Sequence, residues 1–155
     1  MKVHTNDQIL PVHRSIRTYR PEPVDEALLG RLLATAQHAP TDATAQMATL
    51  IRIRDRELRQ RIATLCGEQE HVCEAAEFFV VCADIHRLQS ILTASELVPG
   101  QYPGTALHFA TIDATLVAQR LVDAAEMEGL GTCCIGGVLN VIEELVELLA
   151  LPPGV

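Results

Sequence analysis

The sequence predicts a single globular domain that mixes helices with strands. The chain has 155 residues, which is the length of one ordinary domain. Its residues are 48% hydrophobic and 21% charged, so it can bury enough apolar surface to offset the entropy lost on folding. Apolar residues recur at helical spacing in some segments and form continuous runs of strand length in others.

Two helices and a strand are expected in the first half of the chain. A helix begins near Val24 and ends before Pro40, because the residue before a proline disfavours helical geometry. Residues 48–53 are predicted to form a strand, and a second helix follows from Asp55. The arginines of this second helix are expected to lie on a solvated face. The apolar positions that define the two helices are Leu28, Leu29, Leu32, Leu33 and Ala36, and then Leu58, Ile62 and Leu65.

The second half predicts a central strand and a long helix. Residues 78–83 (FFVVCA) are continuously apolar, which is typical of a strand covered on both faces. Residues 106–128 form a helix that is apolar over much of its circumference, so it is buried or shared with a partner. A short strand is expected at 132–135, and Asn140 is expected to cap a last helix over 142–149.

The charge distribution excludes one class of partner and restricts where an anion can bind. A net charge of -8 argues against nucleic-acid binding, because neutralising phosphates needs a surplus of Lys and Arg. Aromatic residues make up 3% of the chain, which disfavours a base-stacking surface. The chain has 11 basic and 12 acidic residues through Arg87. After Arg87 it has 1 basic residue and 8 acidic residues. An anion site must therefore use the first half.

The sequence also bears on compartment and metals. Residues 1–10 lack the apolar core of a signal peptide, and no stretch approaches the roughly 20 apolar residues of a membrane span, so a cytoplasmic protein is expected. The five cysteines lack CxxC spacing, and neither disulfides nor a metal site is expected. Packing and redox chemistry both stay open for the adjacent pair Cys133 and Cys134.

Two motifs are candidates for ligand binding. Residues 13–17 (HRSIR) supply two guanidinium groups, a hydroxyl and an imidazole, which suit a phosphate, although a solvated basic turn is the alternative. Residues 129–137 (GLGTCCIGG) follow a helix rather than a strand, so a Rossmann dinucleotide site is not supported. Gly136 and Gly137 would let a flat ligand lie against the backbone, or they form a turn.

The order of these segments resembles a known family. HRSIRTYRPEPV, APTDATAQ, LIRIRD, GEQEHV, AAEFFVVCAD, a long helix and GLGTCCIGG occur in the order found in the FMN-dependent nitroreductases. The nearest branch resembles the NADPH-dependent, oxygen-insensitive nitroreductases and flavin reductases, over essentially the whole chain. The resemblance implies an α+β fold with a central mixed sheet flanked by helices. It also implies an intertwined homodimer with FMN at the interface between subunits.

The resemblance assigns candidate cofactor-binding residues. Residues of the first motif match those that hold the FMN phosphate and ribityl chain. Thr41 matches a residue near the flavin, and Gln69 matches one that approaches the isoalloxazine ring. Residues 134–137 match a backbone stretch that lies along this ring. Asp42 and Ala43 depart from the family pattern, and Cys134 stands where an aromatic residue is usual. The full candidate set is His13, Arg14, Ser15, Ile16, Arg17, Thr41, Gln69, Cys134, Ile135, Gly136 and Gly137.

The implied activity is an FMN-dependent oxidoreductase that uses NAD(P)H. In a ping-pong cycle, NAD(P)H reduces the flavin by hydride transfer and leaves, and a nitroaromatic, quinone or free flavin is then reduced as the small-molecule electron acceptor. No side chain is required as catalytic acid or base. His71 is a candidate proton donor, or else a surface or capping residue.

The resemblance further implies that residues 1–155 form one FMN-binding domain that lacks the family's C-terminal extension. That extension carries a strand and two cations at the FMN phosphate. A truncated, catalytically weak or inactive flavin-binding relative is therefore the alternative function. A helical interaction module, which rests on the long apolar helix alone, is the other.

Overall fold

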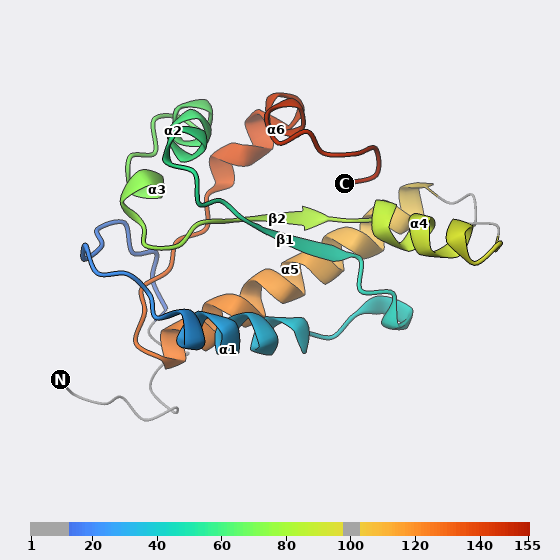
Figure 1. The fold of residues 1–155 in the computed structure, drawn as a ribbon, viewed down its shortest axis with the longest axis horizontal. Helices are drawn as coiled ribbons and strands as arrows, with labels where there is room; N and C mark the ends of the chain where they lie inside the picture. The colour runs from blue at the N-terminus through green and yellow to red at the C-terminus, as the bar shows by residue number, and fades with distance from the viewer. Residues whose placement is uncertain (1–12, 98–102) are drawn as a thin grey trace.

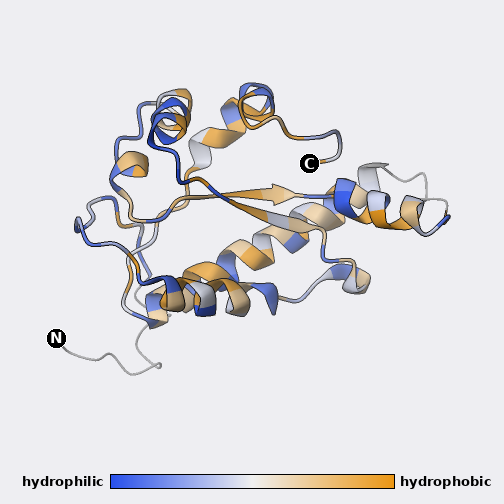
Figure 2. Cartoon of the chain, in the orientation of Figure 1, coloured by the Kyte–Doolittle hydropathy of each residue, from blue (hydrophilic) through white to orange (hydrophobic). Residues whose placement is uncertain are grey.

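Two short strands lie at the centre of the fold. In this computed structural model, which describes residues 13–97 and 103–155, β1 (Ala48–Arg52) pairs antiparallel with β2 (Phe79–Ala83). Ala48 lies opposite Ala83, and Arg52 lies opposite Phe79. Helices cover both sides of the pair (Figure 1), and β2 is hydrophobic along most of its length (Figure 2). The predicted α+β class is therefore confirmed.

One side of the strands is covered by α5 (Pro103–Met127), which also packs against α1 (Glu26–Gln37). Both helices confirm the predictions from apolar spacing. Helix α1 begins after Asp25, whose carboxylate accepts a hydrogen bond of 2.9 Å from the Leu28 amide. Leu32 of α1 packs against Ala124 and Ala125 of α5, and these small alanines allow the two helices to approach closely.

The other side is covered by α2 (Arg56–Leu65) and α6 (Ile142–Leu148), with the single turn α3 (His71–Glu74) beside α2. Their core contains Ile53, Ile62, Cys66 and Leu145, all at most 5% exposed. The strands contribute Ile51 and Val80 to the same core. The fold therefore has three layers, with the strands in the middle (Figure 1).

Two elements lie outside the predicted pattern. Helix α4 (His86–Ala94) follows β2, and the short 3₁₀-helix η3 (Asp42–Thr44) precedes β1. The amides of Ile85 and His86 at the start of α4 donate to the Gly154 carbonyl, at 2.8 and 3.1 Å. These two bonds hold the last described residues beside the end of β2.

Several expectations from the sequence are wrong. In the described residues β2 pairs with β1 alone, so it is not a central strand with a neighbouring strand on each side. Its Val81 is 36% exposed. The sheet of these residues is antiparallel rather than mixed. Residues 132–135 form no strand, because the Thr132 carbonyl accepts from a loop amide instead of a strand. Asn140 ends the 3₁₀-helix η4 (Gly136–Asn140), and Val141 precedes α6 without a side-chain cap.

The arginine-rich segment also differs from its prediction. Arg56 and Arg61 are exposed as expected, but Arg59 is buried. Its guanidinium donates to the carbonyls of Ile53 (2.7 Å), Ala75 (2.6 Å) and Ala76 (3.4 Å), which satisfy its hydrogen-bonding needs away from water. Burial lowers the pKa of Arg59.

An ion-pair cluster joins α1 to the strands. Arg52 of β1 contacts Glu77 at 2.6 Å and Glu26 at 2.9 Å, and Arg54 also contacts Glu26 at 3.3 Å. The hydrogen bonds that Arg52 donates to Glu26 lower the pKa of the exposed Glu26 carboxyl, and those that it donates to Glu26 and Glu77 raise the pKa of Arg52. Two of the five arginines between residues 52 and 61 are therefore already paired.

The packing of η4 against α2 depends on Gly137. A Cβ on this residue would overlap the Cys66 carbonyl oxygen, whereas a Cβ on Gly136 would meet no atom within 4 Å. We expect Gly137→Ala to lower the free energy of unfolding by about 1 to 3 kcal/mol, because the backbones must separate. Gly136→Ala is the matched control and should change it by less than about 0.5 kcal/mol. Urea denaturation measures both, and equal midpoints for the two variants would contradict the packing argument.

Candidate functional site

The first motif lies against the end of α5 (Figure 1). The Ile16 amide donates a hydrogen bond of 2.8 Å to the Thr132 carbonyl. His13 Nδ1 lies 2.7 Å from Glu126 Oε1, and the Thr132 hydroxyl donates to the same oxygen at 3.0 Å. Because a carboxylate only accepts hydrogen bonds, His13 Nδ1 must carry a proton. The structure thus brings together two sequence motifs that are more than 100 residues apart.

A glycine allows this close approach. A Cβ on Gly131 would lie 2.9 Å from the Ile16 Cβ, so a larger residue would displace the first motif. The Tyr19 hydroxyl donates to the Ile16 carbonyl at 2.7 Å, and burial raises the pKa of Tyr19. Both backbone hydrogen-bonding groups of Ile16 are therefore occupied.

The remaining side chains of the first motif are open to solvent. Arg14, Ser15 and Arg17 are exposed, and among the described residues neither arginine has an ion-pair partner. Two guanidinium groups without a carboxylate partner among the described residues lie beside a hydroxyl. Together these groups supply the hydrogen-bond donors that a phosphate requires. The basic segment is anchored by its backbone and His13, and within residues 13–97 and 103–155 no carboxylate competes with an anion for its arginines.

The later glycine motif continues from this anchor to the end of α2. Cys134 and Gly136 are exposed, Ile135 is half-buried, and Gly137 contacts the Cys66 carbonyl. Gln69 follows the same end of α2, where its backbone amide donates to the Ala63 carbonyl at 3.0 Å. Candidates from the glycine motif and Gln69 therefore both adjoin the last turn of α2.

His71 lies two residues beyond Gln69, at the start of α3. Its Nε2 atom is buried and has no hydrogen-bond partner among the described residues. His71 is half-buried, so it is not a fully exposed surface residue. It is also not a helix cap, because Glu70 occupies the N-cap position of α3.

Thr41 lies elsewhere, at the far end of α1 (Figure 1). Its hydroxyl donates to Asp113 Oδ2 at 2.6 Å and accepts from the backbone amide of Gln46 at 2.7 Å. The segment around it has three non-glycine residues in the left-handed region, with φ of 46° at Ala43, 58° at Thr44 and 52° at Gln46. Such conformations cost about 1 to 3 kcal/mol each, so surrounding contacts must hold them.

Asp113 supplies those contacts from the middle of α5. It is 1% exposed, and besides Thr41 it accepts from the Asp42 amide at 2.9 Å and the Met47 amide at 3.0 Å. Burial alone would raise the pKa of Asp113, but the three hydrogen bonds outweigh it and lower the pKa below its ordinary 3.8. Among the described residues no cation pairs with it.

Helix α5 therefore separates Thr41 from the other candidates. Asp113 and Glu126 are 13 residues apart on one helix, which corresponds to about 20 Å along its axis. Thr41 contacts the first of these residues and His13 contacts the second. One copy of the chain does not bring Thr41 to the first motif.

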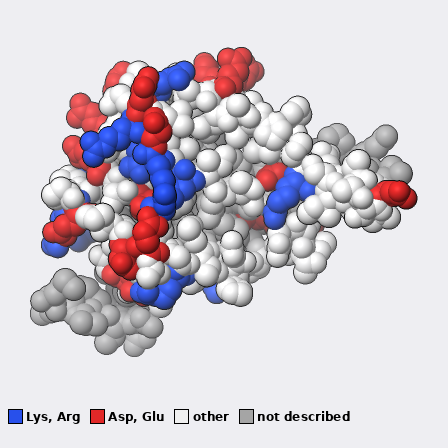
Figure 3. Space-filling view, viewed as in Figure 1, with Lys and Arg blue, Asp and Glu red and all other residues white. Residues whose placement is uncertain are grey.

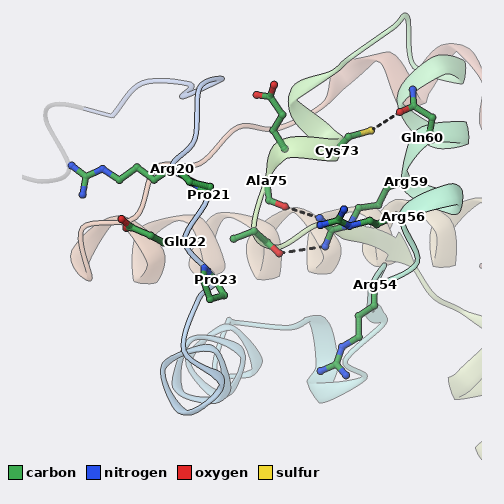
Figure 4. A pocket seen from close by; sticks show the side chains of 12 residues that line it. Arg20, Pro21, Glu22, Pro23, Arg54, Arg56, Arg59, Gln60, Cys73 and Ala75 are labelled. Atoms are coloured by element: carbon green, nitrogen blue, oxygen red, sulfur yellow. Dashed lines mark hydrogen bonds between the residues drawn. The ribbon is translucent and has the colours of Figure 1, made fainter.

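A hollow of about 610 Å³ lies beside α2 and α3 (Figure 4). None of the candidate residues lines it. Arg20, Arg54, Arg56 and Arg59 contribute to its wall, but Arg59 donates to backbone carbonyls and Arg54 pairs with Glu26. Its cations do not converge on one point (Figure 4), and its lining contains no residue of the predicted site.

Comparison with known proteins connects this geometry to a family. The model of the nitroreductase family matches residues 12–155. The chain belongs to the nitroreductase family. Among curated proteins it is 39% identical over 145 residues to the oxygen-insensitive NADPH nitroreductase of Salmonella typhimurium, covering 94% of this chain and 59% of that protein. It is 34% identical over 142 residues to the FMN reductase (NADPH) of Bacillus subtilis, covering 90% and 57%.

Solved structures agree with the family assignment. The NfrA1 nitroreductase from Bacillus subtilis superposes with a TM-score of 0.92 at 30% identity, over 97% of this chain and 62% of that one. The NADPH:FMN oxidoreductase from Vibrio harveyi, complexed with NAD+, superposes with a TM-score of 0.86 at 30% identity, over 95% and 62%. This nitroreductase-family chain thus spans about three-fifths of the length of the relatives it matches.

Sequence reasoning missed the residues that anchor the site of this nitroreductase-family chain. Glu126 and Thr132 hold the first motif, and Asp113 holds the Thr41 segment. Asp113 carries a signal that could have found it, because it is the only charged residue between positions 103 and 119 of the long helix. Glu126 carries none, since acidic residues are common near the ends of exposed helices.

The lowered pKa of Asp113 predicts a pH-dependent contribution to stability in this nitroreductase-family chain. A carboxylate with a lowered folded pKa stabilises the fold above its ordinary pKa, and this contribution is lost as the pH falls through the folded value. At pH 7, Asp113→Asn should cost about 2 to 4 kcal/mol, because its NH2 group would face at least one of the three donors that the carboxylate accepts from. The difference from wild type should shrink below pH 3.8. Urea denaturation at pH 7 and pH 3 checks this, and a constant difference would contradict it.

Proposed function

We propose that the protein is an FMN-dependent oxidoreductase that uses NAD(P)H to reduce nitroaromatics, quinones or free flavin. The observation that carries the proposal is the hydrogen bond between the Ile16 amide and the Thr132 carbonyl. It joins the basic first motif to the glycine motif along one edge of the fold. The names of the relatives, which include an NADPH nitroreductase and an FMN reductase, support the same chemistry.

The first motif has the donors that the FMN phosphate needs. Arg14 and Arg17 would contribute charge-assisted hydrogen bonds, and the Ser15 hydroxyl a third. His13 Nε2 is the second polar atom of a ring that Glu126 already orients. These exposed groups fit an anion, since the described residues offer the arginines no carboxylate.

The glycine motif fits a flat ring. Gly136 has no atom within 4 Å of where a Cβ would stand, so its backbone is open on that side. Cys134, Ile135 and Gly137 would lie along the ring with it, and Gln69 would approach the ring from the end of α2. When bound, FMN supplies the hydride chemistry between NAD(P)H and the acceptor, and the chain supplies binding and orientation.

A second copy of the chain would complete the site. Thr41 lies about 20 Å along α5 from the first motif, so it reaches a flavin only from another subunit. Exposed apolar residues support such an interface. On α5 they include Ile112 and Leu116, at 40% and 37% exposed, and Val81 of β2 is 36% exposed. Figure 3 shows a broad uncharged area beside a band of mixed charge.

The compartment follows from thiol chemistry. All five cysteines are free, although they include the adjacent Cys133 and Cys134, which fits a reducing compartment. No helix among the described residues is long and apolar enough to cross a membrane. We propose a cytoplasmic location on the basis of the thiols.

Reconstitution tests the function directly. The purified chain is incubated with FMN and desalted, and its visible spectrum is recorded. NADPH oxidation is then followed with a quinone or a nitroaromatic as acceptor. Bound flavin with acceptor-dependent NADPH oxidation supports the proposal. Bound flavin without turnover would favour the inactive flavin-binding relative instead, and a colourless protein would overturn FMN binding.

The phosphate assignment predicts the effect of one substitution. Arg17→Ala should weaken FMN binding at least tenfold, because a charge-assisted contact contributes about 1.5 to 3 kcal/mol. Arg61→Ala removes an equally exposed cation from α2 and is the matched control. Fluorescence titration of FMN measures both affinities. Equal FMN affinities for Arg17→Ala and wild type would show that the phosphate binds elsewhere.

The interface assignment predicts a homodimer at micromolar concentration. Leu116→Glu should raise the dimer dissociation constant at least tenfold, because a buried unpaired charge costs several kcal/mol. Ala34→Glu places the same charge on the exposed side of α1 and should leave the dimer intact. Light scattering coupled to gel filtration reports the mass. A stable wild-type monomer would count against both the dimer and a site completed by Thr41.

A further inference from the structure

The Thr41 hydroxyl is fully occupied within its own chain. A hydroxyl has one proton to donate, and Thr41 donates it to Asp113 Oδ2 at 2.6 Å. The same oxygen accepts from the Gln46 amide at 2.7 Å. This hydroxyl therefore has no proton left for a ligand, although Thr41 is a candidate flavin-binding residue.

Asp113 connects both ends of the segment that contains Thr41. Its two carboxylate oxygens accept from the Thr41 hydroxyl and the Asp42 amide at one end, and from the Met47 amide at the other. Between these ends Ala43, Thr44 and Gln46 have left-handed backbone, which is uncommon outside glycine. Because Asp113 is 1% exposed on a long helix, it is a rigid point of attachment.

We propose that Asp113 is a positioning residue for the flavin site, and that Thr41 acts as its link to the segment 41–47. The carboxylate holds the left-handed backbone in the shape that a second copy presents to the flavin. Thr41 thus contributes to flavin binding through the shape of its segment, and its hydroxyl donates no hydrogen bond to the flavin. This inference rests on the proposed FMN site and goes beyond it by assigning a residue that does not touch the cofactor.

Single substitutions measure the two parts of this arrangement. Asp113→Asn keeps the size of the side chain but turns an NH2 group toward at least one donor of segment 41–47, and it should weaken FMN affinity at least tenfold. Thr41→Val removes the hydroxyl with little change of shape and should weaken affinity at least fivefold. Thr41→Ser is the conservative variant, and it should restore affinity to within twofold of wild type because it keeps both hydrogen bonds.

The double variant separates positioning from direct contact. If Thr41 acts through Asp113, adding Thr41→Val to Asp113→Asn should weaken FMN binding by no more than a further twofold. If the hydroxyl bound the flavin directly, the two effects would multiply. Visible circular dichroism of the bound flavin should change in the same way for Asp113→Asn and Thr41→Val, since both alter one segment.

A second buried carboxylate provides the matched control. Asp84 is 5% exposed, and its carboxylate accepts from the Thr49 hydroxyl and the Arg87 amide. Its backbone amide donates to the Met47 carbonyl at 3.0 Å, and Asp84→Asn leaves this bond in place. Asp84→Asn should lower the unfolding temperature and leave FMN affinity within twofold. All titrations are made at least 15 °C below the unfolding temperature of each variant.

The outcomes are distinct. Wild-type FMN affinity and circular dichroism in Asp113→Asn would overturn the inference and leave the proposed function intact. An equal loss of affinity in Asp84→Asn would also overturn it, because the effect would then reflect stability alone. Multiplicative losses in the double variant would overturn the role of Thr41 as a link. Failure of the wild-type chain to bind FMN would instead refute the proposed function itself.

Discussion

Helix α5 is the constraint on which the candidate site depends. Its carboxylates at Asp113 and Glu126 hold two segments that are distant in sequence, and the helix fixes the separation between them. A helix does not shorten, so the Thr41 segment and the basic first motif stay about 20 Å apart within one chain. The proposal that a second copy completes the site rests on this rigidity.

The same helix explains how acidic residues serve a site that would bind an anion. Asp113 is surrounded by donors from segment 41–47, and Glu126 is occupied by His13 and Thr132. Each carboxylate accepts hydrogen bonds from the segment that it holds, so each of these two acidic residues serves to fix a segment in place. The excess of acidic residues after Arg87 is thus compatible with an anion site built from the first half.

The sequence predicted the elements whose signal is local. Helices α1, α2 and α5 and both strands follow from apolar spacing and continuous apolar runs, and the structure adds the caps Asp25 and Asp55. The resemblance predicted the candidate residues, whose binding roles stay predictions. The sequence could not predict that 132–135 pairs with a loop, since a short apolar run is equally suited to either. The burial of Arg59 was also missed, because two of its three carbonyl partners, Ala75 and Ala76, are more than 15 residues away in the sequence.

Competition for hydrogen bonds decides which arginines are available to a ligand. The sequence offers a cluster of five between residues 52 and 61, which has more cations than the first motif. In the fold Arg52 and Arg54 are paired with carboxylates, and Arg59 is surrounded by carbonyls. The exposed Arg14 and Arg17 have no carboxylate partner in the part of the chain that the structure describes, and the backbone of Ile16 and the ring of His13 anchor their segment instead. A small cluster of uncommitted cations binds a phosphate better than a larger cluster whose donors are already satisfied, since the latter must break existing bonds first.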